Sequence, residues 1–123
     1  MIMKIGYVVL YVTDPVASLN FWIEKLGMVE KGSKAAGPFS IVRVGFSDQD
    51  FSFELVPLEL MQNNPDGLNL AAPSIAFYVE DLTASRDTFV AKSVNCTEVA
   101  NHGGIQSFAF SDNEDRWFAV LQG

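Results

Sequence analysis

The sequence is poor in the residues that mark several functional classes. It has one cysteine, Cys96, so no disulfide can form within the chain. It has one histidine, His102, and its eight basic residues are scattered singly, so the clustered positive charge of a nucleic-acid-binding surface is missing. No run approaches the roughly 18 apolar residues that a membrane-spanning helix needs. We therefore expect neither nucleic acid nor a membrane as a partner.

Size and charge narrow the class further. The N-terminus has no basic region followed by an apolar run and a cleavage site, so we expect a cytoplasmic protein. A chain of 123 residues suits a single domain. Hydrophobic residues make up 49% of it, and this surplus of apolar surface favours a homodimer that covers part of it. The net charge of −7 either attracts a cationic small molecule or only keeps the protein soluble.

Two stretches of the chain repeat one another without a gap. Residues 8–28 read VVLYVTDPVASLNFWIEKLGM, and residues 75–95 read IAFYVEDLTASRDTFVAKSVN. The alignment places Tyr11 on Tyr78, so one supersecondary unit occurs twice. Two copies are too few for a long solenoid. They favour a pseudo-twofold domain whose halves close around a ligand.

Each copy is predicted to fold as a strand, a helix and three strands. In the first module, residues 1–57, Asp14 suits a helix N-cap, Pro15 the first helical position and Gly27 the helix end. Alternation and turn residues predict the other elements. Strands are expected at 5–12, 29–31, 39–46 and 51–56, and in the second module, residues 73–123, at 74–79, 97–99, 107–110 and 117–121, with a helix at 82–92. Residues 58–72, rich in turn formers, link the modules, and the fold class is α+β with two tandem βαβββ modules.

Alternation along the strands separates two faces of each module. One face carries large apolar residues and is predicted to lie beneath the helices. The other mixes polar and aromatic residues, as a ligand cleft does. Its candidate ligand-binding residues are Tyr7, Tyr11, Arg43, Glu54, Tyr78 and Trp117. These rings either stack on a planar or cationic ligand or pack in the core or a dimer interface.

Arg43 and Glu54 are expected to face each other across a hairpin. The four-residue loop 47–50 pairs them on the same face of neighbouring strands. Opposite charges so placed attract by roughly 0.2 to 1 kcal/mol. Two interpretations stay open and are compatible: a structural ion pair, and contact with a ligand.

The remaining reactive residues give weaker signals. His102 precedes two glycines and is expected to be an exposed loop residue, with catalysis as the alternative. Cys96 is expected to be a small, partly buried thiol. Three carboxylates lack the spacing of a calcium loop, so a solvated hairpin turn is expected for Asp112, Glu114 and Asp115. No catalytic residue is assigned.

Together these features resemble the vicinal oxygen chelate superfamily, which includes glyoxalase I, extradiol dioxygenases, fosfomycin-resistance enzymes and bleomycin-resistance proteins. The resemblance is carried by the two repeated segments, by the strand FSFELV and by GGIQSFAFSDNEDRWFAVLQ, which is similar to the final hairpin of the family. Paired βαβββ modules in this family form an incomplete barrel that encloses a cleft, usually within a dimer. The resemblance implies the same fold for this chain.

The resemblance also bears on metal binding. Metal-using members place His, Glu or Gln on the first and last strand of each module, so that four side chains converge on one divalent ion. The matching positions here are Tyr7, Glu54, Ser74 and Ala119, and only Glu54 is an ordinary ligand. A divalent site normally needs at least three such donors. We therefore expect no metal and no cofactor.

The leading functional prediction is a metal-free binding protein that resembles the bleomycin-resistance branch. It would sequester an apolar, aromatic or cationic small molecule in its cleft. The alternative is a glyoxalase I-like or dioxygenase-like enzyme, with an atypical metal site or with acid–base work by Glu54 or His102. A third interpretation is a degenerate member that serves as a partner or regulatory subunit.

Overall fold

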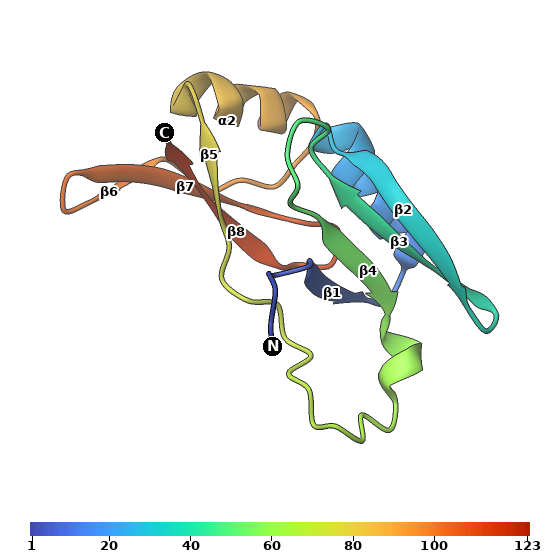
Figure 1. Ribbon diagram of the computed structural model, residues 1–123. Helices are drawn as coiled ribbons and strands as arrows, with labels where there is room; N and C mark the ends of the chain where they lie inside the picture. Colours follow the sequence, from blue (N-terminus) through green and yellow to red (C-terminus); the bar gives the residue numbers. More distant parts are fainter. The chain divides into compact units, whose positions relative to one another are not determined.

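Two four-stranded sheets organise the chain. The computed structural model describes residues 1–123, which divide into unit 1, Met1–Ala72, and unit 2, Pro73–Gly123. Each unit contains one of the sheets and its own helix (Figure 1). None of the helices combines the length and the apolar character that crossing a membrane requires.

Unit 1 forms a mixed sheet of four strands. Its elements in chain order are β1 (Val8–Val12), α1 (Pro15–Asn20), a π-helical turn (Phe21–Lys25), β2 (Val29–Ala36), β3 (Phe39–Gly45), β4 (Phe53–Pro57) and a short 3-10 helix (Leu58–Met61). The strands lie in the order β1-β4-β3-β2. β1 pairs with β4 in parallel, and the other two pairs are antiparallel.

Unit 2 repeats this arrangement. Its elements are β5 (Ala76–Val79), α2 (Leu82–Ala91), β6 (Ala100–His102), β7 (Ile105–Ser111) and β8 (Trp117–Gln122). The strand order β5-β8-β7-β6, with β5 parallel to β8, corresponds strand for strand to unit 1. The predicted α+β fold with two βαβββ modules is therefore confirmed.

The two helices begin with the same device. A carboxylate oxygen of Asp14 accepts a hydrogen bond from the backbone N–H of Ala17 at 3.1 Å, and Asp81 accepts one from Ala84 at 3.0 Å. Each bond satisfies an N–H that the first helical turn leaves without a carbonyl partner. Both predicted N-caps are confirmed.

Aromatic side chains join each helix to its sheet. In unit 1, Trp22 and Phe53 are completely buried, with ring centres 5.0 Å apart. In unit 2, Phe89 of α2 lies edge-on against Phe108 and Phe110, at 5.8 and 5.4 Å. The prediction that the large apolar faces lie beneath the helices is confirmed.

Several predicted boundaries are wrong: the strands expected to begin at 5, 51, 74 and 107 begin two or three residues away, and three elements differ more. The first helix does not continue regularly to Gly27 but changes to a π-helical turn at Phe21. β2 extends beyond residues 29–31 to Ala36, because the chain reverses at Gly37, whose φ of 60° suits glycine. The strand predicted at 97–99 lies instead at 100–102.

Side-chain bonding explains the shift of β6. The backbone N–H of Thr97 donates to the carbonyl of Ala109 at 2.8 Å, as in a ladder. The carbonyl of Thr97, however, accepts from Nε of Arg86 at 2.7 Å. With that acceptor turned toward α2, the ladder is interrupted, and regular pairing starts only at Ala100 opposite Ser107.

The N-cap of α2 generates a stability prediction. Asp81→Ala removes the acceptor for the N–H of Ala84 and should lower the free energy of unfolding by about 1 kcal/mol. Asp81→Asn keeps an acceptor oxygen and should retain most of that stability. Urea denaturation measures both, with Glu80→Ala as the control for loss of a neighbouring exposed carboxylate. Equal losses in the Ala and Asn variants would show that the cap bond is not responsible.

Candidate functional site

The register of the β3–β4 hairpin places two charged residues side by side. Arg43 pairs directly with Glu54, as the loop length predicts. Glu54 also lies beside Val9, because β1 runs parallel to β4. Register partners share one face of a sheet, so this group lies on the face opposite the helix. The residue Glu54 is only 5% exposed, whereas Arg43 is exposed.

The expected ion pair between Arg43 and Glu54 is wrong, although their register is right. Glu54 instead pairs with Lys34 of β2, with Nζ 3.5 Å from Oε2. The guanidinium of Arg43 lies over the ring of Tyr7, with its central carbon 5.6 Å from the ring centre. Backbone pairing fixes Cα positions but not the ends of long side chains, so Lys34 takes the carboxylate while Arg43 turns to the ring.

Gly32 lies next to the Arg43 side chain. It lies opposite Arg43 in the β2–β3 ladder. A Cβ at this position would meet Nη2 of Arg43 at 3.4 Å, which is the limit of ordinary van der Waals contact. Unit 1 therefore brings together Tyr7, Arg43 and Glu54 of the predicted set and adds Lys34, with Lys34 at the carboxylate and Arg43 over the ring.

The other predicted residues lie further apart. Tyr11 and Tyr7 share a face of the β1 segment but are separated by about 13 Å, at 3.3 Å per residue. In unit 2, Tyr78 is 79% exposed and Trp117 is 49% exposed, on the same face of adjoining strands. Tyr78 pairs with Leu121, so about 13 Å of strand separates its ring from Trp117. Each unit thus presents aromatic side chains on its helix-free face.

The side chains at the family's metal positions do not fit a divalent ion. Ala119, paired with Ala76 on the helix-free face of unit 2, has no donor atom, and Ser74 and Tyr7 are neutral hydroxyls. The one carboxylate, Glu54, is already paired with Lys34. Neither unit gathers three or more His, Cys, Asp or Glu side chains in a group that could hold a metal. Lewis-acid chemistry therefore has no donor set within either unit.

Cys96 and His102 are not brought together. Cys96 forms an isolated antiparallel β-bridge with Phe110. His102, which was expected in a loop, is the last residue of β6 and pairs with Ile105. Those partners are five residue steps apart along β7, or about 17 Å. Burial raises the pKa of the Cys96 thiol above its ordinary value, and the nearby Arg86 guanidinium lowers that pKa in part. A Cys–His nucleophile pair is therefore absent.

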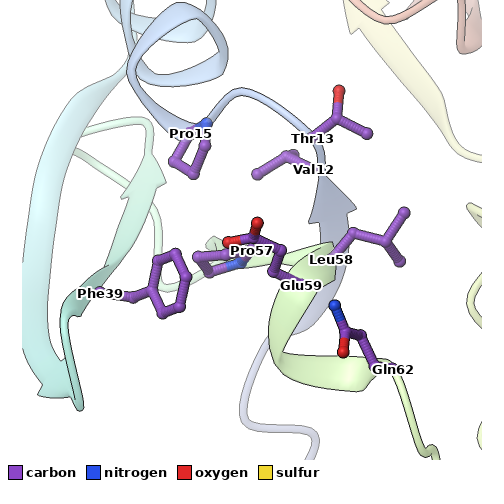
Figure 2. A pocket seen from close by; sticks show the side chains of 8 residues that line it. All are labelled: Val12, Thr13, Pro15, Phe39, Pro57, Leu58, Glu59 and Gln62. Carbon is purple, nitrogen blue, oxygen red and sulfur yellow. The ribbon is translucent and has the colours of Figure 1, made fainter.

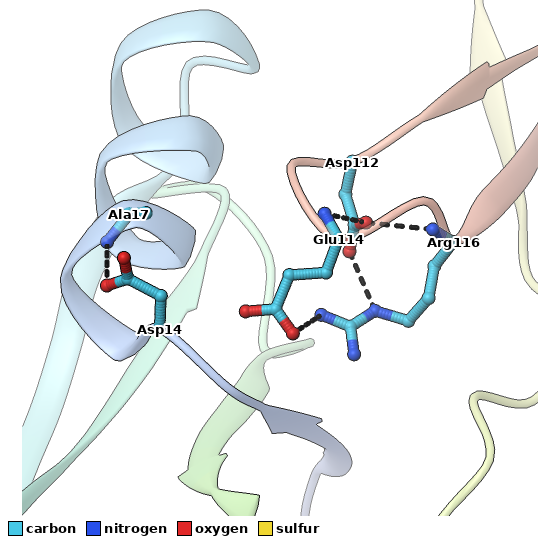
Figure 3. A network of polar contacts seen from close by, with 5 residues as sticks. All are labelled: Asp14, Ala17, Asp112, Glu114 and Arg116. Atoms are coloured by element: carbon cyan, nitrogen blue, oxygen red, sulfur yellow. Dashed lines mark hydrogen bonds and ion pairs between the residues drawn. The ribbon is translucent and has the colours of Figure 1, made fainter.

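The β7–β8 turn contains a polar network, which corrects the expectation of solvated carboxylates for Asp112 and Glu114, whereas Asp115 is exposed as expected (Figure 3). Asp112 is 4% exposed. Its Oδ1 accepts from the backbone N–H groups of Glu114 and Arg116 at 2.9 and 3.0 Å, and its Oδ2 accepts from Nε of Arg116 at 2.7 Å. Arg116 also lies 3.7 Å from the Glu114 carboxylate. These carboxylates hold the turn together.

A groove of unit 1 lies at the end of the sheet, where α1 begins and β4 ends (Figure 2). Its cavity is about 440 Å³, within the usual range of small-molecule pockets. The apolar walls are Val12, Pro15, Phe39, Pro57 and Leu58. Thr13, Glu59 and Gln62 supply the polar part. A second cavity of about 390 Å³ shares Pro15, Phe39 and Pro57 and continues along α1.

Sequence reasoning missed Lys34 and the groove. Lys34 follows from the Gly37–Pro38 turn signal: a hairpin centred there extends β2 to Ala36 and puts Lys34 on the face of Arg43. The groove had a fainter signal, since Pro15, Pro38 and Pro57 mark the ends of three elements. Only the fold brings those ends together.

The thiol of Cys96 generates a chemical prediction. Because burial raises its pKa, little thiolate is present at about pH 8, and alkylation by iodoacetamide should be slower than that of free cysteine. The rate should rise as the pH increases beyond the pKa of a free thiol. Arg86→Gln removes the charge that lowers this pKa and should slow alkylation further, whereas Arg86→Lys should have less effect. A faster reaction in a folded Arg86→Gln variant, checked by circular dichroism, would contradict this account.

Comparison with solved structures supports the fold. A glyoxalase/bleomycin resistance protein/dioxygenase superfamily member from Sphaerobacter thermophilus DSM 20745 is similar with a TM-score of 0.82 at 16% identity, covering 99% of this chain and 98% of the other. TnmS3, an antibiotic binding protein from Streptomyces sp. CB03234, gives 0.78 at 16% identity, covering 98% and 96%. An integron cassette protein from V. cholerae gives 0.71 at 23% identity, covering 99% and 98%.

Sequence comparison identifies the family. No curated protein matched the sequence. The model of one family matches residues 4–120, which span every helix and strand except for the last two residues of the final strand β8. The chain therefore belongs to the Glyoxalase/Bleomycin resistance protein/Dioxygenase superfamily.

Proposed function

We propose that this protein belongs to the bleomycin-resistance branch and binds a small molecule with no metal ion taking part in the binding. The ligand would contact the helix-free faces of the sheets through Tyr7, Tyr11, Arg43, Glu54, Tyr78 and Trp117. One observation carries the proposal: these faces present aromatic side chains, and three of the four residues at the family's metal positions are not ordinary metal ligands. The similarity to an antibiotic binding protein gives further support.

Among apolar, aromatic and cationic ligands, the contacts of unit 1 favour a planar aromatic one. Lys34 pairs with Glu54, and Arg43 lies on the same face, so the group of three carries a net charge of one positive unit. That charge disfavours a cation in contact with Glu54. The guanidinium of Arg43, already over the Tyr7 ring, presents a flat surface on which an aromatic ring stacks. Tyr78 and Trp117 offer exposed rings for the same purpose.

Binding of metal-free bleomycin, which contains aromatic rings, provides the first test. We expect saturable binding by isothermal titration and a higher melting temperature, since a ligand at 100 times its Kd adds about 2.7 kcal/mol to stability. Tyr7→Ala and Trp117→Ala should each weaken binding by about two- to tenfold through loss of ring contacts. Phe51→Ala, which removes an aromatic side chain packed against buried Phe53, is the matched control and should leave affinity unchanged.

If bleomycin does not bind, a panel of flat aromatic compounds of either charge is tested in the same way. The proposal fails if no compound in the panel raises the melting temperature. It also fails if protein purified without a chelating tag contains stoichiometric transition metal and loses a measurable turnover when the metal is removed. That second result would support the glyoxalase-like or dioxygenase-like alternative.

Adding metal-ligating side chains at the family's metal positions tests whether their loss is the reason that no metal binding is expected. The triple variant Tyr7→His, Ser74→His and Ala119→Glu should, together with Glu54, supply the four ligands that metal-using relatives employ. We expect it to bind zinc or nickel at micromolar or lower Kd, and the unmodified protein to bind neither at these positions. Calorimetry and elemental analysis measure both. Equal affinity of the two proteins would show that the four positions do not form the family's metal site here.

A further inference from the structure

We infer that the groove at the start of α1 is a second binding site in unit 1, for a small molecule that joins an apolar group to a primary ammonium. None of the candidate ligand-binding residues of unit 1 lines this groove. Val12 and Pro57 lie opposite each other in the parallel ladder, on the side of the sheet that α1 covers. Tyr7, Arg43 and Glu54 lie on the other side.

The shape of the groove suits an apolar ligand of moderate size. Val12, Pro15, Phe39 and Pro57 form walls around about 440 Å³. The adjoining cavity of about 390 Å³ extends past Leu19 and Val42. Val16 at its rim is 69% exposed, and Leu58 is 37% exposed. Burial of these side chains by a ligand would remove apolar surface from water, which favours binding.

Glu59 gives the groove its charge preference. It belongs to the short 3-10 helix that follows β4, and it lines the first cavity. The ion pairs of the structure join lysine or arginine to Glu54, Glu98, Asp112 and Glu114, so the carboxylate of Glu59 has no cation of its own. In Figure 2, the Phe39 ring and the Gln62 carboxamide point toward the same space. No lysine or arginine lines either cavity.

These features together select an amine. An ammonium group in the first cavity would meet the Glu59 carboxylate and could donate to the Gln62 carbonyl oxygen, while its apolar part contacts Phe39 and Pro57. A carboxylate ligand would meet only the like charge of Glu59. The chain's net charge of −7 adds a negative electrostatic field, which also attracts a positively charged ligand.

The test uses 2-phenylethylamine as the probe and NMR of the full chain with labelled methyl groups. We expect saturable shifts of the Val12, Leu19, Val42 and Leu58 methyl signals, with a Kd in about the millimolar range for so small a ligand. Glu59→Gln should weaken binding of the amine by about two- to fivefold at low salt and have little effect on 2-phenylethanol. Added salt should reduce the difference. Glu30→Gln is the matched control, because Glu30 pairs with Val44 at the opposite end of the sheet.

Each contrary outcome overturns the inference. Equal weakening by Glu59→Gln and Glu30→Gln would indicate a general effect of net charge. Equal binding of 2-phenylethanol, 3-phenylpropanoate and the amine would remove the charge selection. Shifts confined to signals around Tyr7 and Tyr11 would place the amine on the face of the proposed function. Groove signals that respond to dilution of the protein but not to the amine would mean that a second copy of the chain covers the groove.

Discussion

The parallel pairing of the first and last strand of each unit is the constraint on which the other features depend. Two parallel neighbours cannot be joined by a hairpin and need a long crossover connection, which the helix and two further strands supply here. The register places Val9 beside Glu54, and Glu54 beside Arg43, so it decides which side chains share the helix-free face with Tyr7. The same register sets Val12 beside Pro57 and so brings the start of α1 to the end of β4. A slip of one residue in β4 would turn Glu54 toward buried Trp22 and move Phe53 to the helix-free face.

Most of the fold could be predicted from the sequence because it follows from local rules. Aspartate caps start the helices, the repeat predicts the first strand and helix of each module, and alternation with turn residues predicts the other strands and their faces. The candidate site was less accessible. Pairing of Arg43 with Glu54 followed from loop length, but the choice of Lys34 as ion partner depends on the reach of flexible side chains. The start of β6 depends on the bond of Arg86 to Thr97, and the groove depends on three elements far apart in the chain.

The two units retain the same core plan and differ on their other faces. Trp22 and Phe89 hold corresponding places in the repeat, and both pack a ring against the sheet. The positions of Tyr7 and Glu54 correspond to Ser74 and Ala119, which are smaller and uncharged. A pair of identical faces would recognise a symmetric ligand or bind one ion with matched donors. Different faces instead offer charge and stacking from one unit, and mainly aromatic surface from the other.

The position of β1 and β5 at the end of each sheet order has a consequence for motion. Each is held by the ladder to a single neighbour, β4 or β8, and that ladder joins segments distant in the chain. Contacts of that kind close long loops and form late in folding, after the local β3–β4 and β7–β8 hairpins. We expect β1 and β5 to exchange their amide hydrogens faster than the central strands. Tyr11 and Tyr78 belong to these two strands, so a ligand held by their rings would also fasten an edge strand of each sheet.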